Sequence, residues 1–287
     1  MDRAAHLDQK AAASEFPAIE AVPGALDAKA LIICDHAANA IPPEYDMLGL
    51  SREALERHIA YDIGAADVTR VLAAELGAPA VLSTFSRLII DPNRGLDDPT
   101  LVMRISDGAI VPGNAYADAR EIDRRAARFW DPYRNAIAAR AEAMLATGEP
   151  PAVVSIHSFT GVMRGVPRPW KIGLLWDRDE RIPKPLIEAL AVEPDLSADE
   201  VGDNEPYAGA LPGDTIDAIA TSRGLANALI EIRQDLIAEK NDAIAWAKRI
   251  ARLLRPILAE KEARAPKDLG SRAKRSARDR GKPAPAT

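Results

Sequence analysis

The chain has 287 residues, a hydrophobic fraction of 47% and a net charge of −6. It is long enough to bury a large core in one α/β domain, with or without an insertion, and no apolar run approaches the roughly 20 residues that cross a bilayer. The single cysteine, Cys34, excludes an intrachain disulfide and a thiolate cluster for structural zinc.

The N-terminal half of the chain begins with a polar segment and continues with strand and helix patterns. Residues 1–10 lack the basic start and apolar stretch of a secretory signal, so we expect a cytoplasmic protein. The apolar run over 31–35 predicts a buried strand, and residues 52–77 predict a helix with Ser51 as its N-cap. Residues 80–91 predict one or two further strands.

The C-terminal half alternates helices and strands. Turn residues over 97–114 predict a loop, and apolar positions at helical spacing predict a helix over 118–146 that Pro132 would bend. Strands separated by helices predict an α/β fold, with a largely parallel mixed sheet covered by helices on both faces. The further strands are expected at 152–157, 171–176 and 226–232, and the further helices at 184–191 and 241–260.

Residues 261–287 differ in charge from the rest of the chain. They hold nine Lys and Arg against three Asp and Glu, so residues 1–260 carry a net charge of −12. We therefore expect one α/β hydrolytic domain over 1–260 and a basic, disordered tail over 261–287. The tail is either solvated or in contact with an anionic surface, and the acidic body argues against nucleic acid as the main partner. No membrane partner is expected.

Two of the four histidines close strongly apolar runs. His36 follows the predicted strand at 31–35, and His157 ends the predicted strand at 152–157. Open α/β sheets place their chemistry at the carboxyl ends of parallel strands, and imidazole is the commonest metal ligand. The pair therefore indicates a metal site, with the alternative that each histidine caps a buried strand through one hydrogen bond.

Two carboxylates are candidates to complete this site. Glu231 stands where the last predicted strand gives way to polar sequence, and Asp62 lies at a predicted bend. A hydrolytic zinc site needs about three His, Asp or Glu ligands, an open position for water and a nearby carboxylate to take the proton of that water. The alternative for Asp62 is a helix N-cap. A nucleophile made of Cys34 and His36 is disfavoured, because buried cysteines are usually inert.

Five sequence blocks, in this order, resemble the N-formylglutamate amidohydrolase family. Together they are more specific than any one block alone, and the resemblance extends over most of the body. It implies a phosphorylase/hydrolase-like α/β fold, similar to that of the zinc carboxypeptidases and aspartoacylases. The blocks are residues 35–42 (DHAANAIP), 58–64 (HIAYDIG), 86–94 (SRLIIDPNR), 155–159 (SIHSF) and 231–236 (EIRQDL).

The resemblance implies roles for individual residues. His36, Asp62 and His157 would be the ligands of Zn²⁺, and Glu231 would be the general acid/base. Zinc carboxypeptidases take a carboxylate ligand from a His-x-x-Glu motif, but Asn39 stands at the equivalent position here and is a poor zinc ligand. Either the carboxylate comes from Asp62, as we expect, or metal binding is weakened.

These roles predict a hydrolytic mechanism. Zinc would lower the pKa of its bound water, Glu231 would accept the proton, and the hydroxide would attack an amide carbonyl that the metal polarises. Glu231 would then return the proton to the leaving amine. Arg87 or Arg94 is expected to stabilise the tetrahedral oxygen, with a surface salt bridge as the alternative for Arg94.

The substrate is expected to be a small N-acyl amino acid. Its carboxylate would pair with a bidentate guanidinium, for which the candidates are Arg164, Arg168 and Arg233. Asn204 and Tyr207 lie in a turn-rich segment that either closes over the substrate or is an ordinary surface loop.

Three functions are compatible with the sequence. The favoured one is a zinc-dependent amidohydrolase that cleaves an N-acyl amino acid, such as N-formyl-L-glutamate, to a carboxylate and a free amino acid. The second is a zinc carboxypeptidase-like hydrolase of a peptide or cell-wall fragment. The third is a catalytically silent binding protein of the same fold. The oligomeric state is not indicated by the sequence.

Overall fold

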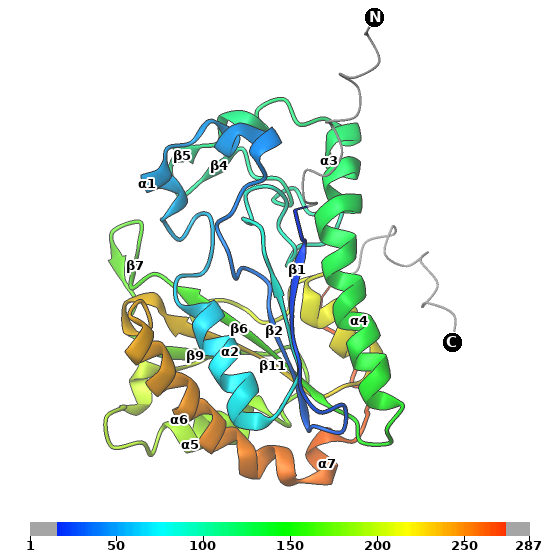
Figure 1. The fold of residues 1–287 in the computed structure, drawn as a ribbon. Helices are drawn as coiled ribbons and strands as arrows, with labels where there is room; N and C mark the ends of the chain where they lie inside the picture. Colours follow the sequence, from blue (N-terminus) through cyan, green and yellow to red (C-terminus); the bar gives the residue numbers. More distant parts are fainter. Residues whose placement is uncertain (1–15, 274–287) are drawn as a thin grey trace, which may run out of the picture.

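A seven-stranded mixed sheet forms the centre of the molecule (Figure 1). The structure is a computed structural model, and it describes residues 16–273. The strand order is β1-β3-β2-β6-β11-β9-β10. Strands β3, β2, β6 and β11 are parallel to one another, whereas β1 and β9 run antiparallel to β3 and β11. The predicted largely parallel mixed sheet is confirmed. Its strands are β1 (Ile19–Val22), β2 (Ala30–Cys34), β3 (Ala80–Ser83), β6 (Ala152–Phe159), β9 (Ile172–Leu175), β10 (Val201–Asp203) and β11 (Asn227–Arg233).

Helices cover both faces of the sheet, as predicted. Because side chains alternate along a strand, Ile32 and Ile156 pack on one face and Ile33 and Val153 on the other. The first face lies against α2, α5 and α6, and the second against α4. Burial of the central strands on both faces explains their continuous apolar runs. The four helices are α2 (Ala65–Leu76), α4 (Asp131–Leu145), α5 (Pro183–Leu190) and α6 (Lys240–Ala259).

The helix predicted over 52–77 is two helices. Ser51 caps α1 (Arg52–Leu55) by accepting a hydrogen bond from the Ala54 N–H, but α2 begins only at Ala65. Gly64 precedes α2 with φ +79°, and a Cβ there would lie 2.1 Å from the Ile237 carbonyl oxygen. The chain therefore turns where it approaches the segment after β11, and Asp62 lies on a loop.

Three other elements differ from the sequence prediction. Over 80–91 only β3 is a strand, and the rest of that segment is irregular. The loop at 97–114 contains a small hairpin, β4 (Ile105–Ser106) and β5 (Ala109–Ile110). The helix at 118–146 is α3 (Ala119–Arg125), a π-helical turn (Ala126–Trp130) and α4, since Pro132 cannot donate an i→i−4 hydrogen bond and a wider turn precedes it.

The segment predicted as a disordered tail is folded over its first part. Residues Lys261–Arg264 form the short helix α7, and the Arg264 side chain is 1% exposed. Its guanidinium donates to the carbonyl oxygens of Leu258 (2.8 Å) and Pro150 (2.7 Å). Residues 261–273 thus pack against the body, and the prediction for that stretch was wrong because its basic side chains have specific acceptors. The remaining predictions for 1–15 and 274–287 concern residues outside those described.

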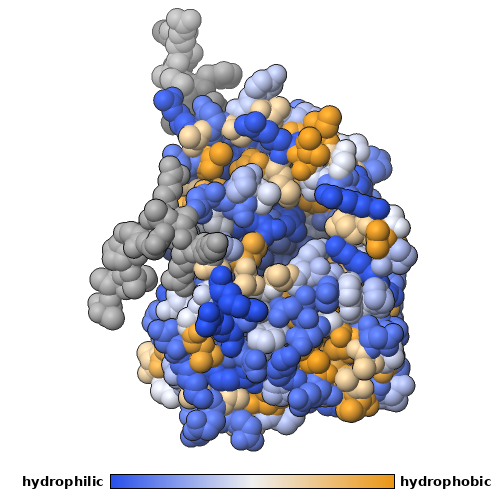
Figure 2. All heavy atoms as spheres, turned by 180° about the vertical axis from the view of Figure 1, so that it is seen from behind, coloured by the Kyte–Doolittle hydropathy of each residue, from blue (hydrophilic) through white to orange (hydrophobic). Residues whose placement is uncertain are grey.

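The surface seen from behind is mostly hydrophilic, with scattered apolar groups and a hydrophilic hollow near its centre (Figure 2). Among the helices of residues 16–273, none combines the length and the apolar composition required to cross a membrane.

We expect Arg264→Ala to lower the free energy of unfolding by about 2–4 kcal/mol, because buried carbonyl oxygens lose their donors. Urea denaturation of the full-length chain measures this loss. Lys261→Ala is the matched control: the Lys261 side chain is 82% exposed, and its removal should change stability by less than about 0.5 kcal/mol. Equal effects of the two substitutions would show that residues 261–273 do not stabilise the body.

Candidate metal centre

His36 and His157 lie side by side at the carboxyl ends of neighbouring strands. His36 follows β2 by two residues, His157 belongs to β6, and these two strands pair in parallel. Both histidines are 2% exposed. The centroids of their rings are 5.0 Å apart at an interplanar angle of 76°. The alternative that each merely caps its own strand does not account for this convergence.

Asp62 meets both imidazoles from the loop between α1 and α2. Its backbone N–H donates to the His36 carbonyl oxygen at 2.9 Å, which fixes the loop against the end of β2. Its Oδ2 lies 3.3 Å from His36 Nδ1 and 2.8 Å from His157 Nδ1. Ligand atoms of the three residues all lie within 4.8 Å of one another, which is close enough to share one metal ion. The helix N-cap is excluded as the role of the Asp62 side chain, since α2 begins after Gly64.

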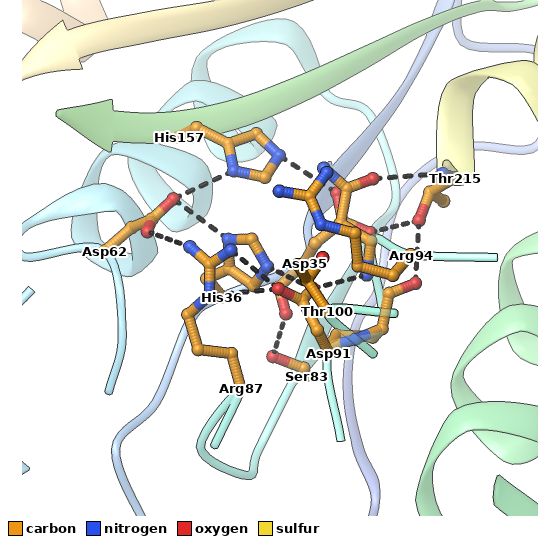
Figure 3. Close-up of polar contacts among 12 residues, drawn as sticks. Asp35, His36, Asp62, Ser83, Arg87, Asp91, Arg94, Thr100, His157 and Thr215 are labelled. Carbon is orange, nitrogen blue, oxygen red and sulfur yellow. Dashed lines mark hydrogen bonds and ion pairs between the residues drawn. The ribbon is translucent and has the colours of Figure 1, made fainter. Parts of the chain in front are cut away.

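A second carboxylate stands behind each imidazole (Figure 3). His36 Nε2 lies 2.8 Å from Asp91 Oδ1, and His157 Nε2 lies 3.1 Å from Asp35 Oδ2. When each Nε2 carries a hydrogen and donates it to its carboxylate, each Nδ1 keeps a lone pair directed at the common centre. The two nitrogen donors and the Asp62 oxygen therefore suit a divalent transition-metal ion.

Each of these rear carboxylates is itself held by further donors. The Arg87 guanidinium binds Asp91 Oδ2 through Nη2 (2.6 Å) and Nε (3.1 Å), and its Nη1 lies 3.6 Å from Asp62 Oδ1. Asp35 accepts hydrogen bonds from the hydroxyl groups of Ser155 and Thr215. These hydrogen bonds hold the two carboxylates in place, and the carboxylates in turn fix the orientation of the imidazoles.

The charges of this cluster shift the pKa values of its members. Burial alone would raise the pKa of Asp91, but Arg87 and His36 outweigh it and hold the pKa well below its usual range. Burial alone would lower the pKa of His157, but Asp35 and Asp62 raise it well above its usual value. The carboxylates thus favour positive charge at this point, which a divalent cation supplies with release of the proton.

Glu231 lies beside this centre on β11. It is the parallel register partner of His157, it is 7% exposed, and its Oε2 is buried without a hydrogen-bond partner among residues 16–273. Burial raises the pKa of Glu231 to about 7, while His157 and Asp62 act on it in opposite directions. A carboxyl group with this pKa can take up and release a proton near neutral pH.

The Arg94 side chain points into the cluster (Figure 3). Its Nε is buried and has no hydrogen-bond partner within the described chain. Its carbonyl oxygen accepts a hydrogen bond from Trp130 Nε1 at 2.9 Å, which anchors the backbone of this loop. The arrangement is that of a guanidinium with unused donors at the site, rather than of a surface salt bridge.

The three arginines considered for a substrate carboxylate differ in their surroundings. Arg168 Nη1 donates to the Tyr207 hydroxyl at 2.9 Å, and the guanidinium stacks 4.8 Å from the centroid of the Tyr207 ring. Arg233 is engaged with Asp235 through two hydrogen bonds. Arg164 is exposed, with φ +50°, in the turn between β7 (Val162–Met163) and β8 (Val166–Pro167). The structure therefore brings Arg168 and Tyr207 together and leaves Arg164 at a hairpin tip.

The side chains of Asn204 and Asn39 both form hydrogen bonds with backbone groups. Asn204 Oδ1 accepts from the N–H groups of Trp176 and Gly209, each at 3.0 Å, and so fixes the turn that carries Tyr207. Asn39 Nδ2 donates to the Leu55 carbonyl oxygen at 2.9 Å and thus ties the end of α1 to the segment after His36. Asn39 is not part of the donor set, which takes its carboxylate from Asp62.

Sequence reasoning missed four polar residues that support the centre. Asp35 and Asp91 lie within the blocks that carry the family resemblance but were not assigned a role, although an acid beside each predicted strand end was a visible signal. Thr215 gave no local signal. Arg134, on the apolar face of α4, is buried and donates to the carbonyl oxygens of Pro92, Arg94, Gly213 and Asp214.

Comparisons with known proteins identify the family and the fold. The family model described as N-formylglutamate amidohydrolase matches residues 28–238. A crystal structure of gene product Atu2144 from Agrobacterium tumefaciens is similar, with 34% identity and a TM-score of 0.80, over 86% of this chain and 97% of that one. The N-formylglutamate amidohydrolase from Ralstonia eutropha JMP134 shares the fold, with 22% identity and a TM-score of 0.63, over 84% of this chain and 97% of that one. No curated protein sequence matches the chain.

We expect the purified full-length protein to bind about one divalent transition-metal ion per chain, removable by a chelator. His36→Ala and His157→Ala should each reduce the metal content to near zero, because only two protein donors remain. His58→Ala is the matched control, since that histidine pairs with Asp107 instead (3.4 Å). Elemental analysis after gel filtration provides the measurement. Full metal content in either of the first two variants would contradict the assigned site.

Proposed function

Because the chain belongs to the N-formylglutamate amidohydrolase family, we propose that it is a zinc-dependent amidohydrolase of small N-acyl amino acids. The reference reaction is hydrolysis of N-formyl-L-glutamate to formate and L-glutamate. The observation that carries the proposal is the convergence of His36, Asp62 and His157 beside the buried, unpartnered carboxyl group of Glu231. The metal donors and a group that can transfer a proton lie together, as metal-assisted amide hydrolysis requires.

His36, Asp62 and His157 would hold the ion. Two imidazole nitrogens and one carboxylate oxygen are a donor set typical of catalytic zinc. When bound, zinc supplies the Lewis acidity that polarises an amide carbonyl and acidifies a water molecule. The role of Asp35 and Asp91 is to keep each imidazole in the tautomer that binds a cation through Nδ1.

Glu231 would move the proton. Its carboxylate takes a proton from the attacking water as the oxygen forms a bond to the amide carbon. The same group then gives this proton to the amide nitrogen as the C–N bond breaks, so that a carboxylate and an amine leave. The buried setting and the pKa of about 7 suit a group that must act as base and then as acid.

The two arginines of the cluster would divide their roles. Arg94 has an unused Nε donor and faces the centre, so it would stabilise the negative charge that develops on the carbonyl oxygen. Arg87 is already committed to Asp91 and Asp62, so it would position His36 and balance the buried charge.

Arg168 would bind a carboxylate of the substrate. It follows the hairpin that leaves the end of β6, and within residues 16–273 no acidic side chain pairs with it. Tyr207 and Phe159 flank its guanidinium, with ring centroids 4.8 and 5.8 Å away, and hold it in a defined orientation. A preoriented guanidinium without an acidic partner favours a planar, bidentate carboxylate over an uncharged group.

Turnover tests the proposal directly. We expect hydrolysis of N-formyl-L-glutamate to be lost on chelation and restored by Zn²⁺. Glu231→Gln should lower kcat by about 10²–10⁴-fold while zinc stays bound, because only proton transfer is removed. Wild-type turnover that survives complete metal removal, or unchanged kcat in this variant, would refute the mechanism. Bound zinc without turnover on a panel of N-acyl amino acids would favour a binding protein.

Substrate recognition provides a separate prediction. Arg168→Ala should lower kcat/KM for N-formyl-L-glutamate by about 10–100-fold, since one charge-assisted contact is lost. The same change should have little effect on the dimethyl ester of this substrate, which carries no carboxylate. Arg164→Ala is the matched control and should leave both rates unchanged. Equal losses for the acid and the ester would show that Arg168 does not recognise a carboxylate.

A further inference from the structure

Thr215 connects Asp35 with the loop that carries Asp91. It is fully buried, immediately before the π-helical turn Ile216–Ala220. Its hydroxyl donates to Asp35 Oδ1 and lies 3.3 Å from the Pro92 carbonyl oxygen. Its backbone N–H donates to Asn93 Oδ1 at 3.0 Å. One residue thus contacts the segment after β2 and the loop that follows β3.

Each of these contacts leads to a different metal-binding histidine. Asp35 accepts at Oδ1 from Thr215 and lies, through Oδ2, 3.1 Å from His157 Nε2. The backbone N–H of Asn93 donates to Asp91 Oδ1 at 2.9 Å, and the same oxygen lies 2.8 Å from His36 Nε2. Thr215 therefore stands one carboxylate away from the His157 imidazole, and Asn93 and Asp91 connect it to the His36 imidazole.

The segment that carries Thr215 is itself fixed. Arg134, 6% exposed, donates to the Gly213 carbonyl oxygen at 2.8 Å and to the Pro92 carbonyl oxygen at 3.0 Å. The segment before Thr215 and the loop that carries Asp91 are thus tied to one buried guanidinium. Because this segment is held in place, the position of the Thr215 hydroxyl helps to determine where the Asp35 carboxylate lies.

We propose that Thr215 is a positioning residue of the metal centre, which couples the carboxylates behind His36 and His157 and so sets the affinity of the ion. This inference rests on the proposed function, because it concerns the same site. A hydroxyl is required since Asp35 is fully buried and a valine of the same shape would leave Oδ1 without that donor. Loss of the hydrogen-bonding groups that orient metal ligands typically lowers metal affinity by about 10–100-fold.

A merely structural role for the hydroxyl must be separated from positioning. Thr69 provides the comparison: it is also fully buried, and its hydroxyl donates to the Ala65 carbonyl oxygen at 2.8 Å within α2. Thr69→Val and Thr215→Val each remove one buried hydroxyl, whose acceptor is a backbone carbonyl oxygen for Thr69 and the Asp35 carboxylate for Thr215. Thr215→Ser keeps the hydroxyl and loses only a methyl group.

The experiment uses the metal-free full-length protein and these three variants. Zn²⁺ affinity is measured by competition with a chromophoric chelator, the visible spectrum is recorded after loading with Co²⁺, and urea unfolding gives the stability without metal. We expect Thr215→Val to weaken Zn²⁺ binding about 10–100-fold and to alter the Co²⁺ spectrum. Thr215→Ser should restore both, and Thr69→Val should change neither even where it lowers stability.

The outcomes are distinct. Failure of the wild-type protein to bind Zn²⁺ would overturn the proposed function and this inference with it. Wild-type binding together with unchanged affinity and an unchanged spectrum in Thr215→Val would overturn the inference alone, as would equal weakening in Thr69→Val. If Thr215→Val does not fold, Thr215→Ala takes its place in the same comparison.

Discussion

Mutual compensation of buried charges is the constraint on which the rest of this structure depends. Asp35 and Asp91 are fully buried and Asp62 nearly so, and a buried carboxylate without partners would cost several kcal/mol. Each is instead shared between an imidazole and a second donor, so no member of the cluster can be moved without leaving another unpaired. The arrangement stabilises the site as a unit rather than as a sum of pairs.

This unit is assembled from segments that are distant in the sequence. The ends of β2 and β6 supply the histidines, the turn before α2 supplies Asp62, and β11 supplies Glu231. The buried Arg134 guanidinium donates to backbone carbonyl oxygens in the loop after Asp91 and in the segment before Thr215, and the Arg87 guanidinium holds the Asp91 carboxylate. Polar cores of this kind allow loops to be as well fixed as strands, which is what a precise donor geometry requires.

The parts of the fold that could be predicted are those that depend on local sequence patterns. Apolar runs identified β2, β6 and β11, and the two strand-end histidines followed from them. Asp62 was placed in the site by family resemblance, while helical periodicity alone extended through it, because the break depends on the close approach of Gly64 to Ile237. The choice of Arg168 over Arg164 and Arg233 likewise depends on side-chain contacts, which pair Arg168 with the distant Tyr207 and Arg233 with the nearby Asp235. Such contacts leave no periodic trace in the chain.

The strand order has a consequence for how the chain acquires this form. β6 and β9 follow each other closely in sequence, yet β11 lies between them in the sheet. Until residues 227–233 arrive, two strand edges face an open gap, and a nascent chain exposes pairing surfaces that other chains can occupy. The sheet therefore closes only after a late, non-local insertion, which favours slow folding. Glu231 arrives with that same strand, so the candidate site is complete only once the gap in the sheet has closed.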